Sequence, residues 1–108
     1  MFFKDQAHKI LYADMIGAIE VDSIEYRSAC YVLSAIGKRD LLRYMGHGID
    51  FISMKEDINF SSGEMALLLV AANLFSSHNE CDISILSYLD SYNITIAIEG
   101  IKMRYSPV

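Results

Sequence analysis

The segment from residue 60 to residue 75 constrains the fold most strongly. It begins Phe60-Ser61-Ser62-Gly63-Glu64 and then continues with an almost unbroken apolar run. Ser61 followed three residues later by Glu64 is the pattern of a capping box, and Phe60 and Met65 occupy the positions of a hydrophobic staple. A helix that is apolar on nearly every side has to be covered by other elements. We therefore predict a central apolar helix over about residues 62–76.

Length and composition place the chain among single globular domains. It has 108 residues, of which 53% are hydrophobic and 21% charged, so we expect one helical domain over residues 1–108. The net charge is −5. An acidic surface disfavours direct binding to nucleic acid, whose phosphates attract basic proteins, and suits a basic protein partner.

The cysteine content and the apolar runs bear on the compartment. Cys30 and Cys81 are the only cysteines, and the first residues lack the basic-then-apolar order of a signal peptide. This pattern predicts reduced thiols in a cytoplasmic protein. The apolar run after Glu64 is much shorter than the ~20 residues that a membrane-spanning helix needs, so no membrane association is expected.

Helix start and stop signals divide the first half of the chain. Lys4 or Asp5 begins a first helical pattern, and Asp22 is placed to cap a second helix with Glu25 at its third position. Gly37 is a favourable residue just after the end of that helix. A short third helix is expected over residues 38–45.

The second half is less regular. Residues 49–59 are expected to form a packed loop with a helical turn that buries the apolar residues Phe51, Ile52, Met54 and Ile58. Asn73, the one polar residue within the apolar run, should find its hydrogen-bond partner in the backbone of that loop. Asp82 is placed to cap a short helix that ends near Leu89.

The last element fits two patterns. Ile94, Ile96 and Ile98 alternate with smaller residues as in a strand, whereas Ile94, Ala97, Ile98 and Ile101 also share one helical face. We favour the helix, because a single strand would have no partner. The chain is thus predicted to be all-α, a compact single-domain bundle of five to six helices around the apolar helix.

No catalytic or metal-binding pattern stands out. The Ser61–Glu64 helix start resembles the phosphate-contacting helix of ABC-type ATPases, but the chain lacks a Gly-x-x-x-x-Gly-Lys-Ser/Thr loop. His78 and Cys81 provide only two of the three or four ligands that zinc requires, and His47 between two glycines lacks an evident partner for catalysis. We therefore expect no enzyme activity, no cofactor and no metal.

Several short motifs resemble a group of small proteins from Gram-positive bacteria and their phages. The most specific are Ser61-Ser62-Gly63-Glu64 followed by Ala66-Leu67-Leu68, and the ending Arg104-Tyr105. Further matching residues are Phe2-Phe3-Lys4-Asp5 with His8, Asp22, Tyr26-Arg27-Ser28-Ala29 with Tyr31-Val32-Leu33, Gly48-Ile49-Asp50-Phe51, Phe60, Asn73-Leu74-Phe75, Ala97 and Gly100-Ile101. The resemblance implies an all-α fold and an origin in phages or mobile elements, and it assigns no activity and no functional residue.

Three functional hypotheses follow. The first is a non-enzymatic phage or mobile-element protein that binds a basic host protein, for example to inhibit a defence nuclease. The second is a self-associating module that forms a homodimer, and the third is a small nucleotide-binding protein that uses the Ser61–Glu64 helix start. For the first hypothesis the candidate interaction surface combines acidic residues and tyrosines: Asp14, Glu20, Glu56, Asp57, Glu80, Asp82, Tyr31 and Tyr44.

Overall fold

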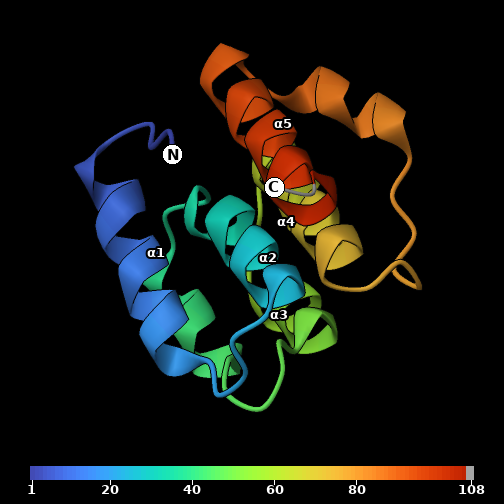
Figure 1. Ribbon diagram of the computed structural model, residues 1–108. Coiled ribbons are helices and arrows are strands. Elements are labelled where there is room, and N and C mark those ends of the chain that lie inside the picture. The colour runs from blue at the N-terminus through green and yellow to red at the C-terminus, as the bar shows by residue number, and fades with distance from the viewer. Residues whose placement is uncertain (107–108) are drawn as a thin grey trace.

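A computed structural model describes residues 1–106, which form one compact, all-helical globule (Figure 1). Five α-helices and two short 3₁₀ helices follow one another, and no strand occurs in this part of the chain. The elements are α1 (Gln6–Ala18), α2 (Ile24–Ser34), η1 (Arg39–Tyr44), α3 (Phe51–Asp57), α4 (Ser62–Phe75), η2 (Ile83–Tyr88) and α5 (Ser91–Tyr105). The all-α prediction is confirmed, and the last element is a helix.

Side chains at the helix starts explain several boundaries. Asp5 accepts a hydrogen bond from the His8 backbone N–H at 2.8 Å, and Asp90 accepts one from Asn93 at 2.8 Å. Ser61 and Glu64 form the predicted capping box at the start of α4. Gly37, with φ of 80°, adopts the left-handed conformation that favours glycine after α2.

Two predicted details of local structure are wrong. Ser23, not Asp22, caps α2, and the Asp22 carboxylate instead binds the Arg27 guanidinium through two hydrogen bonds of 2.7 and 2.8 Å. Asn73 does not bond to the loop over residues 49–59. Its side chain donates to the Asn79 carbonyl at 2.8 Å, while the Asn79 amide donates to the Ala72 carbonyl at 2.9 Å, so the pair closes the turn after α4.

Helix α2 packs against α1, α4 and α5, and α4 packs against α2, α5 and η2. All residues of α2 from Ser28 to Ser34 are buried, and most of α4 is buried as well. Among residues 1–106, no helix combines the length and the apolar character that crossing a membrane requires. The small helices η1, α3 and η2 lie at the edges of this packing.

Candidate functional site

Two of the predicted interaction residues are engaged in ion pairs on or next to α1. Asp14 accepts a hydrogen bond of 2.6 Å from the Arg39 guanidinium, and the Glu20 carboxylate lies 2.8 Å from Nδ1 of His47. Both pairs are exposed to solvent, where such interactions contribute little to stability. The Arg39 guanidinium does, however, offset the negative charge that Asp14 on α1 offers to a partner.

Tyr31 is fully buried, so the prediction that it lies on the interaction surface is wrong. It sits in the middle of α2, where its ring contacts Phe3, His8 and Tyr12, and its hydroxyl donates to the Phe2 carbonyl. Burial raises the pKa of its phenol to about 12. The hydroxyl therefore remains a donor throughout the physiological range and holds the N-terminal segment in place.

Tyr44 and Asp57, two further predicted residues, are brought together by the fold. The Tyr44 hydroxyl at the end of η1 donates to the Asp57 carboxylate at the end of α3, at 3.0 Å. Desolvation, together with this hydrogen bond, raises the pKa of Tyr44. The contact joins the end of η1 to the end of α3.

A shallow hollow of about 230 Å³ lies beside α3. It is lined by Asp50 and Ile52 at the start of α3, by Phe75 at the end of α4 and by Asn79 in the loop that follows. Ile52 is 72% exposed, so its aliphatic side chain is available for contacts beside the hollow. We call Asp50, Ile52, Glu56 and Glu80 together the α3 face.

The α3 face is acidic around its apolar centre. Glu56 follows Ile52 by one helical turn and therefore projects from the same side of α3, while Glu80 directly follows Asn79 at the rim of the hollow. The hydrogen bonds that Asp50 accepts from Ser53 lower the pKa of its carboxyl. None of these three carboxylates pairs with a cation among the described residues, and Lys55 is the one basic residue of α3.

Asp82, the remaining predicted acidic residue, has a local structural role. Its carboxylate accepts a hydrogen bond of 2.9 Å from the Ser84 backbone N–H and caps η2. Hydrogen bonding to Ser84 lowers the pKa of this carboxyl group, which is charged at neutral pH. It lies two residues beyond Glu80 and adds to the negative charge of the same loop.

Sequence reasoning expected Ile52 to be buried, and that expectation is wrong. Residues 51–57 form a true α-helix, and Phe51 and Met54 on one side of it supply the buried contacts. Ile52 is rotated away from that side by the 3.6-residue period. The three-residue spacing of Phe51 and Met54 is that of one face of a helix. Because the sequence predicts a loop here, no helical period was applied that would place Ile52 on the opposite side.

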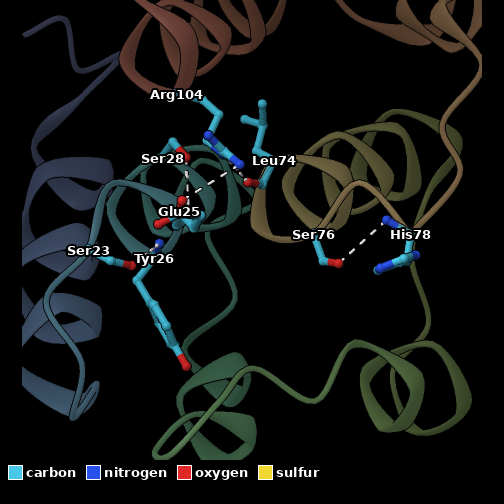
Figure 2. Close-up of polar contacts among 8 residues, drawn as sticks. All are labelled: Ser23, Glu25, Tyr26, Ser28, Leu74, Ser76, His78 and Arg104. Atoms are coloured by element: carbon cyan, nitrogen blue, oxygen red, sulfur yellow. Dashed lines mark hydrogen bonds and ion pairs between the residues drawn. The ribbon is translucent and has the colours of Figure 1, made fainter. Parts of the chain in front are cut away.

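Aromatic contacts and one arginine stabilise the end of α4, which lies next to the α3 face. The Phe75 ring packs between Phe51 and Tyr26, with centroid distances of 5.7 and 5.0 Å. Figure 2 shows Arg104 of α5 between Glu25 of α2 and the Leu74 carbonyl near the end of α4. Its Nε donates to that carbonyl at 2.9 Å, which places a cation at the negative end of the α4 dipole.

The residues considered for catalysis or ligation are not assembled into a site. The Ser61 hydroxyl and the Glu64 carboxylate are occupied with each other's backbone N–H groups, so a carboxylate already stands where a phosphate would bind. This arrangement disfavours the nucleotide-binding hypothesis. Within residues 1–106, His78 and Cys81 belong to no group of three or more potential metal ligands.

Comparisons of the chain with protein families, with curated proteins and with solved structures find no match. On the surface of residues 1–106, the α3 face combines an exposed aliphatic side chain with three carboxylates that lack cationic partners.

Proposed function

We propose that the protein is a small non-enzymatic interaction protein that binds a basic protein partner through the α3 face. In this proposal the helical bundle, with the apolar helix over about residues 62–76 at its centre, is a rigid scaffold. The short helix α3 and the loop after α4 present the contact residues. In this proposal the rest of the surface is not required for binding.

One observation carries the proposal: Ile52 is 72% exposed and lies one turn before Glu56 on α3, at a hollow that is also lined by Asp50 and by Asn79, the residue before Glu80. Protein interfaces combine a desolvated apolar centre with a polar rim that excludes water. Unpaired carboxylates on the rim attract a basic partner and orient its approach. Ile52 would fill an apolar pocket on the partner, while the carboxylates meet its lysines and arginines.

The resemblance to proteins of Gram-positive bacteria and their phages suggests the setting. We propose that the protein acts in the cytoplasm of a bacterial host and that its partner is a host protein. A defence nuclease fits the chemistry, because its nucleic-acid channel is basic and an acidic surface can occupy it. Inhibition would then result from exclusion of the nucleic acid and needs no catalysis.

A capture experiment with matched variants tests this proposal. The tagged full chain is incubated with a Gram-positive host lysate at low and at high salt, and bound proteins are identified by mass spectrometry. We expect the natural chain to capture one stoichiometric partner at low salt and to lose it at high salt. The Ile52→Ser chain and the Glu56→Gln/Glu80→Gln chain should fail to capture this partner even at low salt. The matched controls are Ile10→Ser and Glu20→Gln, which replace an exposed isoleucine and a paired carboxylate outside the α3 face.

Two outcomes of this experiment contradict the proposal. Binding that survives high salt and both α3-face variants would place the interface elsewhere. If Ile10→Ser weakens binding as much as Ile52→Ser does, exposed apolar side chains contribute to binding wherever they lie, and the α3 face has no special role.

Self-association is the second candidate, and a separate observation favours it. Ile98, Ile101 and Tyr105 on α5 are each more than a third exposed and lie about one turn apart along that helix. Two copies could bury these stripes against each other in a two-fold interface. Sedimentation across a wide concentration range tests the idea, because a monomer at the highest concentration excludes it.

A further inference from the structure

A groove of about 610 Å³ lies on a different part of the surface from the α3 face. Its lining includes one stripe of α1 with Lys9, Tyr12 and Ile16, the first turn of α2 with Ile24, and Met103 near the end of α5. The N-terminal segment contributes Phe3. The volume falls within the range of about 300–1,000 Å³ that is typical of small-molecule sites.

Polar and apolar groups are separated along the groove. Lys9 and Tyr12 stand one turn apart on α1, and Ile16 follows one turn later, so the stripe extends for about 10 Å. The Tyr12 hydroxyl makes no hydrogen bond to any other described residue. One end of the stripe thus offers an ammonium and a free hydroxyl, whereas the other end offers only aliphatic surface.

The charges around this end favour an anion. Lys9 is exposed and has no carboxylate within ion-pair distance among residues 1–106. Arg27 also lines the groove, but Asp22 binds its Nε and one terminal nitrogen, so that pair is close to neutral. Asp5, one turn before Lys9, directs its carboxylate to the His8 backbone N–H. Lys9 is therefore an uncompensated cation at the groove.

We propose that this groove binds an anionic single-chain amphiphile, such as a medium-chain carboxylate. The carboxylate would pair with the Lys9 ammonium and accept a hydrogen bond from the Tyr12 hydroxyl. The alkyl chain would lie along Ile16 and Ile24 and against Met103. This ligand site shares no residue with the α3 face, so it stands independently of the proposed partner binding.

Methionine-methyl NMR tests the proposal directly, because two of the six methionines line the groove. Dodecanoate is titrated, below its micelle-forming concentration, into the full chain labelled with ¹³C at the methionine methyls. We expect saturable shifts of the Met1 and Met103 signals and no shift of Met54, which is fully buried in α3. Dodecanol, with the same chain and no charge, should bind more weakly.

Variants separate the head group from the chain. Lys9→Gln should weaken dodecanoate binding about fivefold, the equivalent of one partly exposed ion pair, and should leave dodecanol binding unchanged. Ile24→Ser, at a position 42% exposed, should weaken both ligands. Lys55→Gln on α3 is the matched control and should change neither.

Each of three results would overturn the proposal. The first is the absence of saturable Met1 and Met103 shifts with dodecanoate. The second is equal affinity for dodecanoate and dodecanol, or an unchanged affinity of the Lys9→Gln chain for dodecanoate. Either result would show that Lys9 does not bind the carboxylate. The third is loss of the Met1 and Met103 signals with rising protein concentration and no ligand, which would make a second copy of the chain the occupant.

Discussion

Replacement of Gly100 by alanine should destabilise the protein, although alanine is normally the better helix former. Gly100 is buried in α5 where that helix crosses α2 and α4. A Cβ added there would overlap Cγ2 of Val32 and would lie 3.1 Å from Cδ1 of Leu74. Val32 is β-branched and fully buried, so its side chain has little freedom to move away.

The expected magnitude follows from two opposing terms. Inserting a methyl group into a packed core costs about 1–3 kcal/mol. Alanine in place of glycine within a helix gains up to about 1 kcal/mol. The net loss of unfolding free energy for Gly100→Ala is therefore about 0–3 kcal/mol.

Gly17→Ala is the matched control, because a Cβ at Gly17 in α1 meets no atom within 4 Å. This variant should gain up to about 1 kcal/mol from helix propensity alone. The difference between the two variants isolates the steric term of about 1–3 kcal/mol. With a urea m-value of about 1.5 kcal/mol/M, their unfolding midpoints should differ by about 0.7–2 M.

A third variant shows whether the clash is the cause. Val32→Ala removes the methyl group that the new Cβ would meet, so Gly100→Ala should cost less in the Val32→Ala background than in the natural chain. If Gly100→Ala is instead as stable as Gly17→Ala, the close approach of α5 to α2 at Gly100 is refuted.

Three further predictions concern single side chains. Burial lowers the pKa of His8, whose Nε2 bonds to the Tyr31 carbonyl at 2.9 Å, so the unfolded chain binds more protons and stability should fall as pH drops below about 6.5. Urea titrations at pH 7.5 and 5.5 should show this loss in the natural chain and less of it in His8→Gln, whereas an equal loss in both would refute it. Arg104→Gln removes the charged donor to the Leu74 carbonyl and should lower the unfolding free energy by about 1–2 kcal/mol, with Lys102→Gln as the exposed control. Ser61→Ala should cost about 1 kcal/mol through loss of the α4 cap, and a comparable cost for Ser62→Ala would contradict the capping assignment.

Local signals explain what the sequence predicts well. The cap at Ser61, the glycine at Gly37 and the cap at Asp82 depend on residues a few positions apart, and all are found in the structure. The capping residue of α2 was misplaced by one position, because Asp22 and Ser23 are both good caps and the choice depends on the Asp22–Arg27 contact.

Long-range contacts explain what the sequence does not reveal. Tyr31 is buried by ring contacts with Phe3, His8 and Tyr12, which lie 19 to 28 positions earlier in the chain. The groove exists only because α1, α2 and α5 meet, so the positions of Lys9 and Met103 along the chain gave no hint of it. For the α3 face, the charges at Glu56 and Glu80 were identified from the sequence, whereas the apolar centre at Ile52 was not.

Site-specific photocrosslinking tests the central claim most directly. A photoreactive amino acid replaces Ile52 in one full-length chain and Ile10 in a second, and each is illuminated in a Gram-positive host. The account predicts one discrete crosslinked product from position 52, weakened by Glu56→Gln/Glu80→Gln, and none from position 10. A product from position 10 alone, or no product from position 52, would contradict binding through the α3 face.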